Sequence, residues 1–278
     1  MRRTFGFPVG TQVLSLFRAD ADLKAHPRYR LAKEGDETAA LDLVIDLAVP
    51  WLFANEHRFS NVPCIFVAPH AKEASGDNAI PQTLAAVCAA VLKGSVGSNI
   101  VQTDRVFHTG ADAMERMATR ASFEGAVVSG ARYVLVDDVT NLGGTLAELS
   151  HFIQFYGGLV HDVVVLVNAG RNPSLVPRSK DVRLIQERFQ HEFVHIFNIE
   201  PAALTANEAG YLVDFKSVDA IRNRRAKAEQ EINRRLRSKG IARAPGGTAA
   251  PTAHQQSGLT PPAASLKPNP PTRTPGAS

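Results

Sequence analysis

Residues 133–145 read Tyr-Val-Leu-Val-Asp-Asp-Val-Thr-Asn-Leu-Gly-Gly-Thr, and this stretch decides the fold. The apolar residues at its start predict a buried strand. Two adjacent carboxylates end that strand, and a turn with a glycine pair and a hydroxyl follows. The next segment, from Leu146 to Tyr156, has a helical pattern and is closed by a second glycine pair. We therefore expect a strand, an acidic pair, a small-residue turn and a helix in direct succession.

The turn between this strand and helix is suited to binding an anion. Free backbone N–H groups in a short turn, and the N-terminus of the helix behind it, attract negative charge. Thr145 adds a hydroxyl donor, and Asp137 and Asp138 lie about one ribose away, where they can accept hydrogen bonds from sugar hydroxyls. The alternative is purely structural, because the strands of many α/β domains end in acidic residues that only cap the next helix.

The whole pattern resembles the 5-phosphoribosyl-1-pyrophosphate (PRPP) signature of the type I phosphoribosyltransferases. The resemblance implies that PRPP binds here with Mg²⁺, and that Asp137 and Asp138 are both the catalytic pair and the metal-binding carboxylates. Mg²⁺ prefers phosphate oxygens, water and few carboxylates, so no all-protein metal cage is expected. The turn that would hold the ligand comprises Val139, Thr140, Asn141, Leu142, Gly143, Gly144 and Thr145.

Two residues of the turn depart from the family pattern. Asn141 and Leu142 stand where the family has small hydroxyl residues, so backbone N–H groups and Thr145 would carry more of the phosphate binding. In the hypoxanthine-type relatives, an aspartate that accepts a proton from the base occupies the place of Asn141. An asparagine cannot accept that proton, which argues against purine salvage and leaves reduced activity or another substrate open.

Two other segments are expected to hold the pyrophosphate of such a ligand. The loop at 69–78 carries Lys72, for which a solvated loop lysine is the alternative. The segment at 104–127 loosely resembles the mobile loop of the ComF-type phosphoribosyltransferases and offers Arg105 and Arg120 as cations. For each arginine, a surface ion pair is the alternative.

Composition and order of elements predict an α/β fold. Alternating strand and helix patterns favour a parallel sheet with flanking helices, and the apolar run at 160–167 is typical of a strand covered on both faces. The resemblance implies that this sheet is type I phosphoribosyltransferase-like. A late strand is expected at 193–197, and Thr205 with Glu208 predicts a capping box. The predicted units are an N-terminal helical or hood segment without recognisable chemistry, an α/β core, a helical extension and a disordered tail, at 1–60, 61–200, 201–240 and 241–278.

The compartment expected from the sequence is the cytoplasm. No apolar run approaches the ~20 residues of a membrane helix, and the N-terminus has no signal-peptide pattern. Cys64 and Cys88 lack metal-ligand spacing and are interpreted as buried thiols in a reducing compartment. The net charge of +4 is uneven, with many cations in the predicted helix at 217–239. That helix either docks by one edge, which we favour, or contacts nucleic-acid phosphates.

Two functions fit these observations. The first is a PRPP-dependent phosphoribosyltransferase that uses Mg²⁺, acts on an unidentified base or amine and releases pyrophosphate. The second is a non-catalytic sensor of PRPP or a nucleotide, or a nucleic-acid-associated binding module. No membrane partner is expected, and the sequence leaves a homodimer open.

Overall fold

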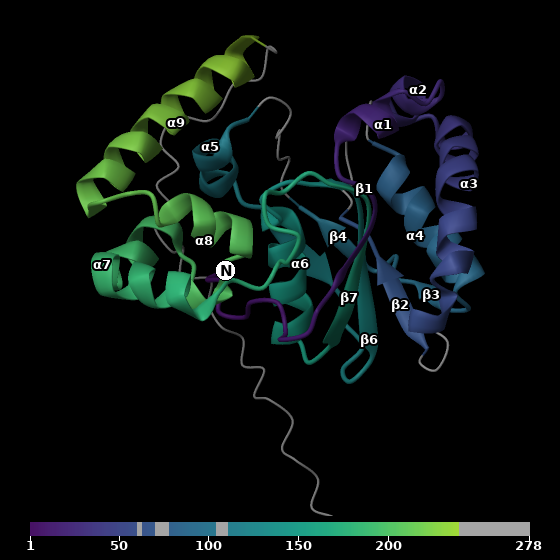
Figure 1. The fold of residues 1–278 in the computed structure, drawn as a ribbon, viewed down its shortest axis with the longest axis horizontal. Coiled ribbons are helices and arrows are strands. Elements are labelled where there is room, and N and C mark those ends of the chain that lie inside the picture. Colours follow the sequence, from purple (N-terminus) through teal and green to yellow (C-terminus); the bar gives the residue numbers. More distant parts are fainter. Residues whose placement is uncertain (60–62, 70–77, 104–110, 239–278) are drawn as a thin grey trace, which may run out of the picture.

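The computed structural model describes residues 1–59, 63–69, 78–103 and 111–238. Within these residues, five parallel strands form one sheet in the order β1-β7-β6-β2-β3 (Figure 1). Its strands are β1 (Val13–Phe17), β2 (Cys64–Val67), β3 (Ser95–Val96), β6 (Arg132–Thr140) and β7 (Leu159–Asn168). An antiparallel ribbon is formed by β4 (Ile100–Gln102) and β5 (Phe123–Gly125). The predicted α/β class with a parallel sheet and flanking helices is confirmed.

Helices cover both faces of this sheet, and further helices form a layer beyond one of them (Figure 1). One face carries α1 (Asp20–Lys24), α2 (Tyr29–Lys33), α3 (Glu37–Ala54) and α4 (Ile80–Val91). The other face carries α6 (Gly144–Phe155). The third layer holds α5 (Ala113–Ala118), α7 (Ser179–Phe197), α8 (Ala206–Leu212) and α9 (Val218–Ser238). Short 3-10 helices lie at η1 (Glu56–Arg58) and η2 (Pro201–Ala203).

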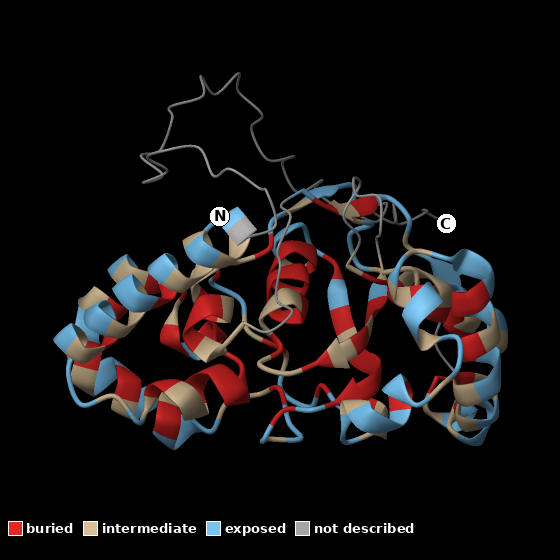
Figure 2. Ribbon diagram, turned by 90° about the horizontal axis from the view of Figure 1, so that it is seen from above, coloured by how far each residue is buried: buried red, intermediate tan, exposed pale blue. Residues whose placement is uncertain are grey.

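Alternating residues of β6 pack into the hydrophobic cores on the two opposite faces of the sheet. Val134 and Val136 belong to the core under α3 and α4, whereas Tyr133 and Leu135 belong to the core under α6. This follows from the two-residue period of a strand. The third core contains no strand residues and consists of α5 and α7 to α9 with the segment between α7 and α8. Figure 2 shows buried residues along the inner sides of the outer helices and exposed residues along their outer sides.

Several local predictions are confirmed. Thr205 and Glu208 form the reciprocal capping box at the start of α8. The hydroxyl of Ser217 accepts a hydrogen bond from the Ala220 N–H at 3.2 Å and so caps α9. Both cysteines are buried and form no disulfide, and burial raises the pKa of the Cys88 thiol to about 12.

The strand predicted at 193–197 is wrong, because these residues end the helix α7. Ile185, Phe189, Phe193 and Phe197 are buried at a spacing of four, which places them on one helical side facing the third core. The prediction used only the short apolar run at 193–197, which is too short to show a helical spacing of four residues. The helix changes direction at Gln190, whose φ is 47°.

The N-terminal segment contributes more than the predicted hood. Its strand β1 lies at the edge of the main sheet, where Val13 is opposite Val163 of β7. The predicted core range of 61–200 therefore leaves out one strand of the sheet. No helix in the described ranges has both the length and the apolar character needed to cross a membrane. The predicted tail at 241–278 lies outside the described residues.

Candidate functional site

The turn after β6 is built around a glycine at the start of α6. Gly143 has a φ of 79°, in the left-handed region that favours glycine, and α6 begins at the next residue. A Cβ atom on Gly143 would lie 2.8 Å from Cδ2 of Leu175. The backbone conformation therefore favours a glycine, and a larger residue would also have to displace the end of the Leu175 side chain. The predicted order of strand, turn and helix is confirmed, but the predicted end of the strand is wrong. Because β6 continues to Thr140, Asp137 and Asp138 lie inside the strand, and the turn begins only at Asn141.

A small cavity opens at this turn, with a volume of about 40 Å³. That volume corresponds to about three water molecules at ~10–15 Å³ each. The hydroxyl Oγ1 of Thr140 is buried there and has no hydrogen-bond partner among the described residues. The lining consists of Arg116, Asp137, Val139, Thr140, Leu142, Gly143, Gly144, Thr145, Leu146 and Glu208. Most of the predicted turn therefore lines one cavity, and a buried hydroxyl is available to a ligand.

The two aspartates near the end of β6 have different surroundings. Asp137 lines the cavity, whereas Oδ2 of Asp138 accepts hydrogen bonds from Lys33 Nζ at 2.8 Å and from Asn78 Nδ2 at 2.9 Å. The Asp138 N–H in turn donates to Oδ1 of Asp137 at 2.9 Å. The predicted pair is therefore unequal: one carboxylate faces the cavity, and the other is held by the chain.

The electrostatics of these groups follow from their surroundings. Burial raises the pKa of Asp137 well above its ordinary value, and the neighbouring charge of Asp138 raises it further. Burial alone would lower the pKa of Lys33, but the attraction of Asp138 outweighs it and leaves that pKa raised. Lys33 therefore stays protonated, and Asp137 is poised to take up a proton.

Two further residues line the cavity that the sequence did not predict as part of the site. Arg116 of α5 brings a cation, and burial lowers its pKa. Glu208 of α8 brings a carboxylate, whose Oε1 would be 3.1 Å from a Cβ atom on Gly144. Both belong to elements far from the turn in sequence, and neither carries a local pattern for the role. The predicted Lys72 and Arg105 lie outside the described residues.

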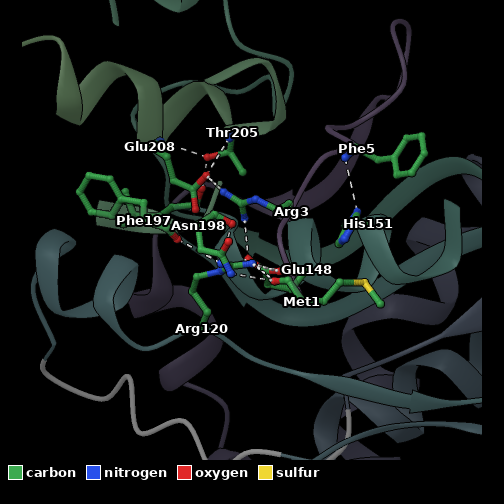
Figure 3. Close-up of polar contacts among 11 residues, drawn as sticks. Met1, Arg3, Phe5, Arg120, Glu148, His151, Phe197, Asn198, Thr205 and Glu208 are labelled. Carbon is green, nitrogen blue, oxygen red and sulfur yellow. Dashed lines mark hydrogen bonds and ion pairs between the residues drawn. The ribbon is translucent and has the colours of Figure 1, made fainter. Parts of the chain in front are cut away.

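A buried network of ion pairs holds α8 against α6 and the N-terminus (Figure 3). Arg3 is fully buried and pairs with Glu208 at 2.5 Å and with Glu148 at 3.2 Å. Arg120 pairs with the same Glu148 at 2.6 Å and donates to the carbonyls of Phe197 and Asn198. The predicted role of Arg120 as a cation for pyrophosphate is therefore replaced by a structural one.

A second, larger cavity of about 800 Å³ adjoins the first. The two share Leu142, and the second continues along the loop that follows β7. Its lining consists of Asp112, Ala113, Asn141, Leu142, Ala169, Gly170, Arg171, Asn172, Pro173, Arg178, Ala206, Asn207, Gly210, Tyr211 and Arg224. The carboxyl edge of a parallel sheet is where ligands bind in open α/β folds.

Close contacts fix the wall of this second cavity. A Cβ atom on Gly170 would lie 2.6 Å from the carbonyl oxygen of Asn141 and 2.4 Å from Nδ2 of Asn207. The side chain of Asn207 accepts a hydrogen bond from the Asn172 N–H at 2.8 Å and donates to the Asn172 carbonyl at 3.2 Å. The loops after β6 and β7 and the helix α8 therefore form one connected frame.

An acidic cluster nearby is engaged in ion pairs. Asp112, Glu115 and Glu231 bring their carboxylate oxygens within 4.8 Å of one another. Arg224 of α9 pairs with Asp112, and Arg235 pairs with Glu115 at 2.6 Å. These contacts attach α9 to α5, as expected for a helix that docks by one edge.

No protein-family model matches the chain. The chain is 35% identical over 249 residues to Protein TraN of Escherichia coli, a match that covers 85% of this chain and 54% of TraN. It is 38% identical over 136 residues to an uncharacterised protein of Haemophilus influenzae, covering 48% of this chain and 30% of that protein. The chain thus spans about half the length of TraN. Neither relative bears a ComF-type name.

Solved structures similar to this chain include phosphoribosyltransferases. The adenine phosphoribosyltransferase of Leishmania tarentolae superposes with a TM-score of 0.34 and 13% identity, covering 60% of this chain and 94% of that chain. The adenine phosphoribosyltransferase of Thermoanaerobacter pseudethanolicus gives a TM-score of 0.30 and 18% identity, with coverages of 48% and 81%.

Proposed function

We propose that this protein is a PRPP-dependent phosphoribosyltransferase, which transfers the phosphoribosyl group to a base or an amine and releases pyrophosphate. One observation carries the proposal: Asp137, the unpartnered hydroxyl of Thr140, the glycine turn and the start of α6 line the same cavity. A sugar phosphate needs donors for its phosphate and acceptors for its hydroxyls, and this cavity offers both. The buried thiols Cys64 and Cys88, which form no disulfide, support a cytoplasmic location.

Each group of the cavity has a role in this proposal. The N–H groups at the start of α6 and the cation of Arg116 hold the phosphate. Asp137 accepts hydrogen bonds from the ribose hydroxyls, which stabilises its ionised form and releases any proton it carries. Cleavage of the anomeric C–O bond makes the ribose ring cationic, and the carboxylate of Asp137 favours that charge.

Mg²⁺ belongs to the proposal as the ion that accompanies the pyrophosphate. Asp138 is already held by Lys33 and Asn78, so Asp137 is the carboxylate of the pair that remains for a metal. This fits an ion that takes few carboxylates and keeps phosphate and water ligands. Mg²⁺, when bound, would neutralise the leaving pyrophosphate.

The second cavity is the place we propose for the acceptor. It adjoins the first at Leu142, and Asn141 brings an amide with both donors and an acceptor to its wall. An acceptor nitrogen there would form the new C–N bond as the C–O bond to pyrophosphate breaks and the pyrophosphate leaves with the bonding electrons. The identity of the acceptor is left to the assay.

The proposal is tested by titrating the protein with PRPP and Mg²⁺ and then assaying pyrophosphate release with a panel of bases and amines. Asp137→Asn is the site variant, and Asp214→Asn, an exposed position outside both cavities, is the matched control. We expect wild type and Asp214→Asn to bind PRPP and to release pyrophosphate with at least one acceptor. A folded wild-type protein that gives no binding heat and no thermal shift with PRPP contradicts the proposal.

The second candidate function is a PRPP or nucleotide sensor without catalysis. The contacts between α8 and the glycine turn favour it. The Thr205 hydroxyl donates to the carbonyl of Leu142, and Glu208 lies against Gly144. A phosphoribosyl group that entered this cavity would contact Glu208 of α8, so its binding would shift α8 in this second candidate function. Because α8 and α9 share one core, that motion would reach α9. A sensor would bind PRPP, release no pyrophosphate with any acceptor, and show changed hydrogen exchange in α8 and α9.

A further inference from the structure

An ion pair from the N-terminal segment reaches the acidic end of β6. Lys33 is the last residue of α2, and its ammonium lies 2.8 Å from Oδ2 of Asp138. The Ala79 N–H donates to the carbonyl of Ala32 at 3.0 Å, so α2 is fixed to the residues that precede α4. The lysine side chain is 35% exposed, whereas that of Asp138 is 6% exposed. The cation therefore stands at the surface of a buried carboxylate.

Asp138 has little capacity left for a ligand. Its Oδ2 accepts from Lys33 and Asn78, and its Oδ1 accepts from the Val139 N–H at 2.9 Å. An ionised carboxylate offers about four acceptor positions, so one remains. A divalent ion at Asp138 would have to displace the ammonium group.

Lys33, by contrast, has capacity to spare. An ammonium group has three donors, and Asp138 is its hydrogen-bond partner among the described residues. The remaining donors lie at the carboxyl edge of the sheet, on the side covered by α2 and α4. The glycine turn at Gly143 lies at the N-terminus of α6, the helix that covers the other face of the sheet. The acidic pair therefore separates two places that attract anions.

We propose that Lys33 binds the diphosphate of a phosphoribosyl ligand and supplies, at Asp138, positive charge that a divalent ion would otherwise provide. The inference rests on the proposed function, because it needs a ligand with anions on both sides of a ribose. The glycine turn then holds the 5-phosphate, Asp137 the hydroxyls, and Lys33 the diphosphate at C1. The diphosphate takes the donors that Asp138 leaves unused, so the ion pair persists in the complex.

The test compares two ligands that differ only in the diphosphate. Ribose 5-phosphate and PRPP are titrated calorimetrically, with and without Mg²⁺, into wild type, Lys33→Met and Lys33→Arg. Lys24→Met is the matched control, because Lys24 is an exposed lysine paired with Asp20 on α1. A charge-assisted hydrogen bond contributes roughly 1.5–3 kcal/mol, and tenfold in affinity corresponds to about 1.4 kcal/mol. We therefore expect Lys33→Met to weaken PRPP binding by about 10- to 100-fold and ribose 5-phosphate binding by less than about threefold.

Two further results belong to the expectation. Lys33→Arg should keep most of the PRPP affinity, and the Lys33→Met variant should depend more steeply on Mg²⁺ than wild type. Lys33→Met also leaves Asp138 without its cation, so the double variant Lys33→Met with Asp138→Asn removes both charges and serves if the single variant unfolds. The double variant should still bind ribose 5-phosphate and should still lose PRPP affinity.

The outcomes separate this inference from the function on which it rests. Equal weakening of both ligands, or no change in either, shows that Lys33 is only structural and overturns the inference while leaving PRPP binding in place. A wild-type protein that binds neither ligand overturns the proposed function and this inference together.

Discussion

Arg3 and Glu208 lie 205 positions apart and form an ion pair in which the arginine is fully buried. Glu208 belongs to the cavity at the glycine turn and also accepts a hydrogen bond from the Thr205 N–H, which caps α8. Through this pair, the N-terminal residues fix the helix that covers the turn. The position of α8, and with it the size of the cavity, therefore depends on a residue three positions from the start of the chain.

The first prediction concerns this pair. Arg3→Met should lower the free energy of unfolding by roughly 3–5 kcal/mol, because it leaves a buried carboxylate without its partner. Arg2→Met is the control, since Arg2 is half-exposed and its pair with Glu200 is worth about 1 kcal/mol or less. Urea unfolding of both variants measures the difference. Equal, small losses in the two variants would show that the buried pair contributes no more than an exposed one.

The second prediction concerns pH. The folded-state pKa of Asp137 is raised above the value of 3.8 that applies to the unfolded chain. The stability that its proton provides is therefore fully present below about pH 4 and is lost as the pH rises through the folded-state pKa. Asp137→Asn should remove this dependence, so the variant should gain stability relative to wild type between pH 4 and pH 7. Denaturant unfolding across that range measures the gain, and a constant difference at all pH values would contradict it.

The third prediction concerns the glycine turn. Gly143→Ala should lower the free energy of unfolding by roughly 2–5 kcal/mol, of which a left-handed alanine accounts for about 1–2 and the clash with Leu175 for about 1–3. Gly10→Ala is the matched control, since Gly10 also has a positive φ but has open space around its Cβ position. It should show the backbone cost alone. If the two variants lose the same stability, the close approach at Leu175 has no energetic weight.

The fourth prediction concerns the basic helix α9. Arg235→Gln should cost roughly 1–3 kcal/mol because it breaks a partly buried pair with Glu115, whereas Arg234→Gln, at an exposed position, should stay within about 0.5 kcal/mol. The exposed cations for a nucleic-acid test are Lys227, Arg234 and Arg237. We expect no salt-sensitive retention of DNA or RNA in a gel shift. Tight binding that falls steeply with salt, and is lost when these three become glutamine, would show phosphate contacts instead.

Local patterns in the sequence were sufficient for the central motif and for several helix boundaries. The run from Tyr133 to Thr145 contains its own strand, turn and left-handed glycine, and capping residues such as Thr205 and Ser217 act within three or four positions of themselves. These interactions are short in sequence, so their residue types reveal them. The helix α7 shows the limit of such patterns. Its apolar residues recur every four positions, and this helical spacing can be recognised only over the whole length of the helix.

The sequence by itself determined that a glycine turn and a helix follow a strand with two adjacent carboxylates, because every group of that motif lies within thirteen residues. The tertiary structure alone decided that Asp137 faces the cavity while Asp138 is held by Lys33, and that Arg116 and Glu208 line the same space. In a parallel sheet the carboxyl ends of all strands meet at one edge, which brings together loops from distant parts of the chain. Residues that meet there are far apart in the sequence and form no local pattern, so their contacts can be recognised only in the folded chain.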